Sequence, residues 1–195
     1  AIYFTYVIPN FVSTDNDINL STNRPLEVNS LSINNSMIRV ISVGQLRPEK
    51  GHYDLVLSFI DVLKSYSNAI LILIGSGPEK ERILNCVKQN NLSNNVFLLG
   101  SLSNPIDWMH YSDIFVLPSR CEGFPNALLE AMSVGCSVIS SNCDFGPKEI
   151  ITNGYDGILY ESENINMLSD KIIQLCVNKD LRKSLGINAK NVIHY

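Results

Sequence analysis

Short runs of apolar residues recur from residue 37 onward, and they alternate with longer stretches in which apolar residues repeat every three or four positions. The short runs are rich in β-branched residues, a pattern typical of strands that are buried on both faces of a sheet. They cover residues 37–44, 69–75, 95–101, 113–119 and 136–141, with a shorter run at 156–160. The longer stretches predict amphipathic helices at residues 53–66, 78–90, 104–111, 125–135, 163–178 and 179–194.

Alternating strands and helices with short connections indicate βαβ units, whose crossovers are right-handed. The pattern therefore predicts an α/β fold with a doubly wound, Rossmann-like parallel sheet and helices on both faces. We expect one such domain over residues 37–195. Because ligands bind beyond the carboxyl ends of the strands in these sheets, the chemistry should lie in the loops that follow them.

The first part of the chain has a different composition. Residues 10–35 are rich in Asn, Ser, Thr and Asp, which compete with the backbone for hydrogen bonds and favour turns. We interpret residues 1–36 as an interdomain linker with a remnant of a preceding domain. Since the chain also begins at Ala rather than Met, we expect a piece of a longer protein.

Composition and charge narrow the functional classes. A hydrophobic fraction of 45% without a run of roughly 20 apolar residues predicts a globular chain with no membrane span. Five cysteines without CxxC spacing fit a reducing compartment, so we expect a cytoplasmic protein, including a peripheral position at the inner membrane face. The net charge of -4 argues against nucleic acid as a partner.

The stretch CEGFPNALLEAMSVG at residues 121–135 carries the strongest candidate chemistry. Glu122 directly follows a predicted strand, and Pro125 stands where a first-turn helix proline belongs. The free backbone N–H groups around Gly123, Phe124 and Asn126 would then face an anion in the crevice.

Glu130 lies about one turn beyond Asn126 on the same helix face. A carboxylate there can accept hydrogen bonds from a vicinal diol such as ribose. An ordinary exposed glutamate on a helix is the alternative interpretation.

The loop SVGQLRPEKGH at residues 42–52 presents two cations, Arg47 and Lys50, at the same sheet edge as Glu122. An arginine fork and a lysine point charge together can neutralise a diphosphate, although solvated loop charges would look the same in the sequence. The glycine turn at residues 75–79 lacks the last Gly of GxGxxG, so it is weak evidence for a dinucleotide site.

Four motifs together resemble a known family. They are G-x-L-x-x-x-K-G at 44–51, GSGPE at 75–79, VFLLGS at 96–101 and EGFPNALLEAM at 122–132. In this order, each at a strand end, they resemble the C-terminal nucleotide-sugar-binding domain of retaining GT-B glycosyltransferases of the group 1 type. The closest resemblance is to bacterial enzymes that build polysaccharides or lipid-linked oligosaccharides.

The resemblance implies a role for each motif. Arg47 and Lys50 would meet the donor diphosphate, Glu122 the donor sugar, and Glu130 the ribose, while the turns at 75–78 and 100–102 would line the base. The implied donor-binding set is Gly44, Arg47, Lys50, Gly75, Gly77, Ser101, Leu102, Glu122, Gly123, Phe124, Pro125, Asn126 and Glu130, with Glu122, Arg47 and Lys50 expected to act in catalysis.

One position departs from the family pattern. Many relatives place Arg directly after the first glycine, where this chain has Gln45. Arg47 has therefore taken over that role or is a bystander.

The resemblance further implies retaining transfer from a UDP-sugar, less readily a GDP-sugar, to a saccharide or lipid-linked acceptor held by an N-terminal domain. It implies no metal and no cofactor, and we expect this chain alone to be inactive. The sequence DND at 15–17 mimics a metal-binding DxD motif, but no strand precedes it. The three histidines, His52, His110 and His194, are scattered and receive no role.

Two other classes stay open at this stage. A glycoside hydrolase would use Glu122 and Glu130 as its carboxylate pair, flanking one sugar bond without phosphate-binding cations. A non-catalytic nucleotide-binding module would need no catalytic group, but the full glycine fingerprint of a dinucleotide site is missing.

Overall fold

A computed structural model describes residues 25, 33–34, 36–144 and 146–193 of the chain. The proposed linker over residues 1–36 and the DND sequence lie almost wholly outside the described residues. Within the described residues, no helix has the length and apolar character that crossing a bilayer requires.

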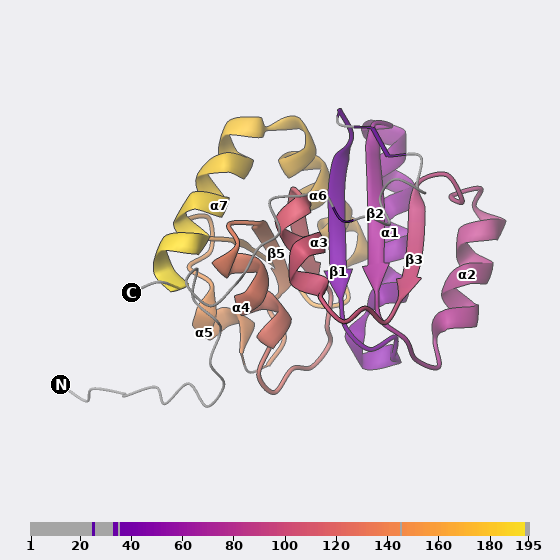
Figure 1. The fold of residues 1–195 in the computed structure, drawn as a ribbon, viewed down its shortest axis with the longest axis horizontal. Coiled ribbons are helices and arrows are strands. Elements are labelled where there is room, and N and C mark those ends of the chain that lie inside the picture. Colours follow the sequence, from indigo (N-terminus) through magenta and orange to yellow (C-terminus); the bar gives the residue numbers. More distant parts are fainter. Residues whose placement is uncertain (1–24, 26–32, 35, 145, 194–195) are drawn as a thin grey trace.

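Six parallel strands form one sheet with the order β3-β2-β1-β4-β5-β6 (Figure 1). They are β1 (Ile38–Val43), β2 (Ala69–Ile74), β3 (Val96–Gly100), β4 (Ile114–Leu117), β5 (Ser137–Ser141) and β6 (Ile158–Tyr160). This is the strand order of a doubly wound nucleotide-binding sheet, so the predicted fold class is confirmed.

Helices connect the strands close to where the sequence predicts them. They are α1 (His52–Ser65), α2 (Lys80–Gln89), α3 (Pro105–Tyr111), α4 (Asn126–Ser133), α6 (Ile165–Val177) and α7 (Lys179–Ile193), with the short α5 (Pro147–Ile150) and the 3-10 turn η2 (Pro48–Lys50). The prediction missed only the two short elements, because a single turn carries no periodic signal.

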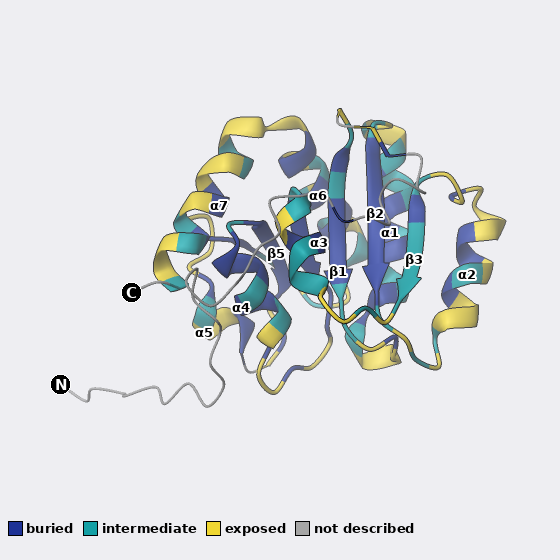
Figure 2. Ribbon diagram, viewed as in Figure 1, coloured by how far each residue is buried: buried dark blue, intermediate teal, exposed yellow. Residues whose placement is uncertain are grey.

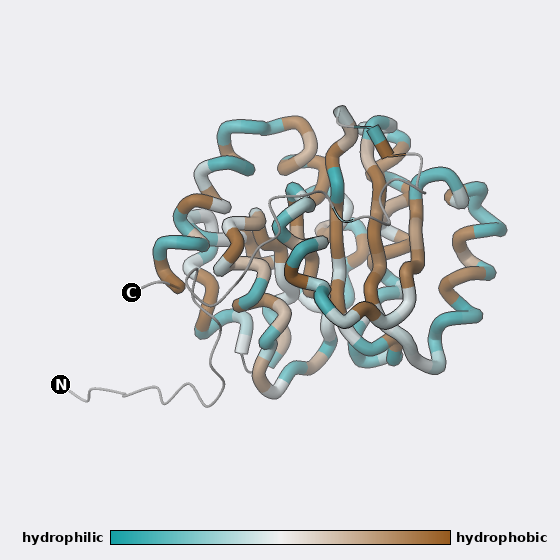
Figure 3. Tube along the Cα trace, viewed as in Figure 1, coloured by the Kyte–Doolittle hydropathy of each residue, from teal (hydrophilic) through white to brown (hydrophobic). Residues whose placement is uncertain are grey.

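Alternate residues of each strand face opposite helix layers. Val40 belongs to the core under α1, α2 and α6, whereas its neighbour Ile41 belongs to the core under α3 and α4. Figure 2 shows the resulting burial, with the central strands buried and the outer helix faces exposed. Figure 3 shows the same contrast in hydropathy, with hydrophobic central strands and more hydrophilic outer helices. A sheet covered by helices on both faces is what the continuous apolar runs predict.

The chain changes direction across the sheet between β1 and β4. Strands β2 and β3 extend from one side of β1, and β5 and β6 extend from the far side of β4. The carboxyl ends of β1 and β4 therefore form the topological switch point, where such sheets bind ligands. The loop after β1 carries Lys50, and the loop after β4 carries Glu122.

Gly51 brings these two loops together. Its φ of +68° is in the left-handed region, and a Cβ on it would stand 2.0 Å from the carbonyl oxygen of Pro118. The Arg120 backbone N–H donates to the Glu49 carbonyl at 2.8 Å, and the Arg120 guanidinium donates to Asp54 at 2.7 Å. The start of α1 is thus fixed against the loop that follows β4.

Candidate functional site

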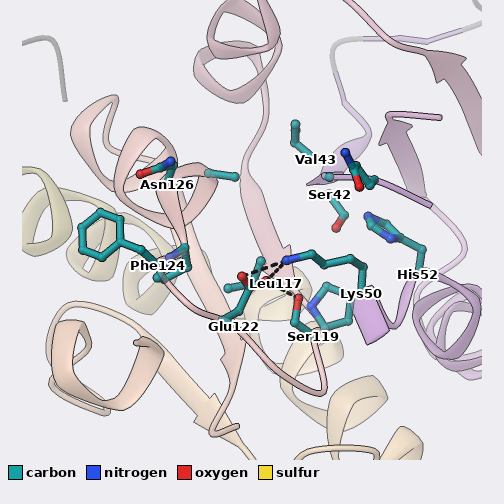
Figure 4. A pocket seen from close by; sticks show the side chains of 14 residues that line it. Ser42, Val43, Lys50, His52, Leu117, Ser119, Glu122, Phe124 and Asn126 are labelled. Carbon is teal, nitrogen blue, oxygen red and sulfur yellow. Dashed lines mark hydrogen bonds and ion pairs between the residues drawn. The ribbon is translucent and has the colours of Figure 1, made fainter. Parts of the chain in front are cut away.

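Lys50 and Glu122 form a close ion pair at the switch point (Figure 4). The Lys50 Nζ donates to both carboxylate oxygens at 2.8 Å, and the Ser119 hydroxyl donates to Oε1 at 2.5 Å. The Glu122 side chain is only 6% exposed and that of Lys50 is 28% exposed. A charge this deeply buried is stable only with such partners, so the pairing fixes both side chains in place.

The support for this pair extends one residue deeper. The Ser141 hydroxyl, at the end of β5, donates to the backbone carbonyl of Ser119. Ser119 and Ser141 are both fully buried. The carboxylate therefore rests on a hydrogen-bonded connection that joins β4 to its neighbouring strand.

A cavity of about 370 Å³ lies beside the ion pair. Its walls include the predicted residues Gly44, Lys50, Glu122, Phe124, Pro125 and Asn126. The volume is within the range of small-molecule sites. The structure thus brings the two main sequence motifs to one cavity.

A second cavity of about 260 Å³ adjoins the first, and both are lined by Val43, Gly44 and Gln45. It lies at the carboxyl ends of β2 and β3, where Gly75, Ser76, Ser101 and Leu102 contribute to its wall. The hydroxyls of Ser76 and Ser101 are 2.9 Å apart and share a hydrogen bond. The two cavities form one crevice along the sheet edge.

Four predicted residues, Arg47, Gly77, Gly123 and Glu130, lie outside the walls of both cavities. Arg47 is exposed, and its guanidinium lies 3.8 Å from the Glu49 carboxylate. Glu130 is half-buried on α4, and its carboxylate has no hydrogen-bond or ion-pair partner among the described residues. Burial raises the pKa of this carboxyl. Gly77 packs against the backbone of Leu46, where an added Cβ would come within 2.4 Å of the carbonyl oxygen.

The backbone at the start of α4 differs from the expectation in one detail. The Asn126 N–H was expected to be free for an anion, but it donates to the Phe124 carbonyl at 3.0 Å. Gly123 is exposed, with open space around the position that a Cβ would occupy. The turn before the helix therefore uses one of the expected donors internally.

Sequence reasoning gave no role to His52, which the structure places in the cavity wall. The ring is 3% exposed, and neither ring nitrogen has a hydrogen-bond partner in the described part of the chain. Burial lowers the His52 pKa to about 4, with a further contribution from the positive charge of Lys50. The sequence feature that could have pointed to His52 is its position directly after Lys50 and Gly51, in a loop already assigned to the site.

The family model described as glycosyl transferases group 1 matches residues 23–192. An uncharacterized glycosyltransferase of Methanocaldococcus jannaschii is 34% identical over 208 residues, covering 92% of this chain and 51% of that protein. The chain therefore spans about half the length of this relative.

Solved structures show the same architecture. The C-terminal domain of a glycosyl transferase group 1 family protein from Francisella tularensis superposes with a TM-score of 0.75 at 28% identity, covering 80% of this chain and 84% of that one. A variant of S. aureus TarM, in complex with fondaparinux, alpha-GlcNAc-glycerol and UDP, gives a TM-score of 0.78 at 28% identity over 84% of this chain and 34% of that one.

Proposed function

Because the chain belongs to the glycosyl transferases group 1 family, we propose that its crevice binds a nucleoside diphosphate sugar as the donor for sugar transfer. The observation that carries this proposal is the Lys50–Glu122 pair at the switch point, beside a cavity that both main motifs line. A cation and a carboxylate side by side suit a ligand that has a phosphate next to a polyhydroxylated ring.

The two charges have different roles in this proposal. Lys50 binds the diphosphate, on which negative charge develops as the bond to the sugar breaks, and so stabilises the transition state. Glu122 accepts hydrogen bonds from the sugar hydroxyls and orients the ring. The α4 N-terminus adds the positive end of a helix dipole to the same wall.

We further propose that the donor is a UDP-sugar. The smaller cavity, between the turns at 75–76 and 101–102, would hold the base. Glu130, which lines neither cavity in the free chain, would contact the ribose of the bound donor. The similar S. aureus structure contains UDP, which supports uracil over guanine.

The proposal also covers the stereochemistry of transfer, the class of acceptor and the absence of a metal requirement. We infer retaining transfer to a saccharide or lipid-linked acceptor by a cytoplasmic protein, with Lys50 supplying the charge stabilisation that a metal ion supplies elsewhere. All described candidate side chains come from one sheet edge, so the acceptor would be held mainly by residues outside this set. Transfer should then need a second domain and should survive chelators.

The glycoside hydrolase alternative is less consistent with the geometry. Glu122 is paired with Lys50, and Glu130 lines neither cavity, so the two carboxylates do not flank a common space. The non-catalytic module alternative gives no reason for a buried carboxylate beside the phosphate-binding lysine.

A thermal-shift panel tests the proposal. UDP and UDP-sugars at about 100 times their dissociation constant should stabilise the chain by roughly 2.7 kcal/mol, with a smaller shift for GDP and none for NAD. The shift should persist in EDTA and should shrink in Lys50→Met but not in Lys64→Met, a control on an exposed pair. Stabilisation by NAD alone would overturn the proposal.

A further inference from the structure

Two buried polar side chains in the cavity wall have no hydrogen-bond partner among the residues that the structure describes. The Ser42 hydroxyl and both ring nitrogens of His52 are buried and make no hydrogen bond within the described residues. Ser42 is fully buried and His52 is 3% exposed. Buried polar groups are nearly always hydrogen-bonded, so an unpaired cluster beside a cavity points to a partner that occupies the cavity.

The fold places these two residues on the same side of β1. Ser42 alternates with Val43 along the strand, so it lies on the face that carries α1, and His52 is the first residue of that helix. A Cβ on Gly44 would stand 3.3 Å from the His52 ring, so the glycine leaves the ring room at the cavity floor. Figure 4 shows both side chains directed toward the space beside Lys50.

The chemistry of this wall favours an anion with several acceptor oxygens. A serine hydroxyl and a neutral imidazole each supply one donor, and the Lys50 ammonium supplies a charge. Neutral donors are suited to this position, because a second buried cation would repel Lys50. A sugar hydroxyl is a weaker match, because it carries no negative charge for the Lys50 ammonium to neutralise.

We propose that Ser42 and His52 form, with Lys50, the subsite for the distal phosphate of the donor. This inference rests on the proposed function and names two further ligand-binding residues of the same site. In the free protein the Lys50 ammonium already donates to both oxygens of Glu122. Ser42 and His52 would therefore donate to the phosphate oxygens that Lys50 cannot reach while it keeps this contact.

Binding of UDP and of UMP to variants of the 195-residue chain tests the assignment. Ser42→Ala and His52→Phe should each weaken UDP binding about 10- to 100-fold, the range for a lost hydrogen bond to a charged group, and should leave UMP binding little changed. His52→Asn, which keeps an N–H donor, should recover part of the UDP affinity.

Matched controls separate this effect from a general loss of structure. Ser58→Ala removes a buried hydroxyl from α1 that bonds the Leu55 carbonyl away from the cavity, and His110→Phe changes an exposed histidine on α3. Neither should change the ratio of UDP to UMP affinity. Unfolding midpoints of all variants establish that each is folded at the assay temperature.

The outcomes are distinguishable. If the unsubstituted chain binds neither UDP nor GDP, the proposed function fails and this inference fails with it. If UDP binds but Ser42→Ala and His52→Phe bind it as well as the unsubstituted chain does, only the phosphate subsite is overturned. An equal loss for UDP and UMP would likewise overturn it, because the pair would then serve the nucleoside half or the fold.

Discussion

Replacing Lys50 by methionine should destabilise the chain by about 1 to 3 kcal/mol, and adding Glu122→Gln should recover most of that loss. Methionine keeps much of the apolar stem but removes the ammonium that donates to both oxygens of the carboxylate at 2.8 Å. Among the described residues, the buried carboxylate would then retain only the Ser119 hydroxyl as a donor. The instability of the single variant would therefore come from an unpaired charge rather than from lost packing.

The expected magnitude follows from the burial of the two partners. Breaking a fully buried pair costs about 3 to 5 kcal/mol, whereas an exposed pair contributes about 0 to 1 kcal/mol. Glu122 is at the buried limit, with a 6% exposed side chain, but Lys50 is 28% exposed, so water can approach the remaining charge. The loss should lie between the two limits.

Urea unfolding of the single variants and the double variant measures this coupling. Lys64→Met is the matched control, because its ion pair with Asp61 has side chains 70% and 48% exposed and should contribute less than about 1 kcal/mol. A double variant as unstable as Lys50→Met would refute the reasoning, since the cost would then not arise from the isolated carboxylate.

Three further predictions concern single positions. Gly51→Ala should destabilise the chain by more than about 2 kcal/mol in urea unfolding, because its Cβ would collide with the Pro118 carbonyl, whereas Gly154→Ala, at φ +81° with open space, should cost only about 1 kcal/mol. The free energy of unfolding should fall by up to about 3 kcal/mol between pH 6.5 and 4, because the unfolded chain binds a proton at His52 that the folded chain, with a His52 pKa of about 4, does not. His52→Phe should flatten this pH dependence. An unchanged pH dependence in His52→Phe would contradict the lowered pKa of His52. Glu130→Gln should raise the unfolding midpoint at pH 7, because burial raises the pKa of this unpartnered carboxyl and its charged form opposes folding. The same variant should lose the preference for UDP over its 2′,3′-dideoxy analogue. Equal affinity of the unsubstituted chain for the two ligands would contradict the proposed contact between Glu130 and the ribose.

The fold could be predicted because strand burial and helix periodicity are local signals. The continuous apolar runs identify all six strands, and their spacing gives the βαβ order. The same reasoning places Lys50 and Glu122 at one sheet edge, because each follows a strand of a parallel sheet. It does not give the 2.8 Å pairing, which depends on Gly51 packing against Pro118 across the sheet.

The details that sequence reasoning missed depend on turn geometry and burial. Arg47 precedes the 3-10 turn η2, whereas Lys50 is its last residue. The turn therefore leaves the Arg47 side chain exposed and places Lys50 in the cavity wall. The Asn126 N–H is used by the turn before α4. The burial of His52 follows from tertiary packing around Gly44, which no periodicity encodes.

The resting ion pair has a consequence for how a donor would bind. In the free protein Lys50 is held by Glu122, so a phosphate must share or displace that contact, and Glu122 must find replacement donors. Sugar hydroxyls would supply such donors, while a nucleoside diphosphate without a sugar would not. In Lys50→Met the carboxylate is already unpaired in the free chain, and the sugar hydroxyls would pair it. The penalty of this substitution on binding should therefore be smaller for the UDP-sugar than for UDP. Equal penalties for the two ligands would mean that Glu122 keeps its contact with Lys50 throughout, and that it takes no part in recognising the sugar.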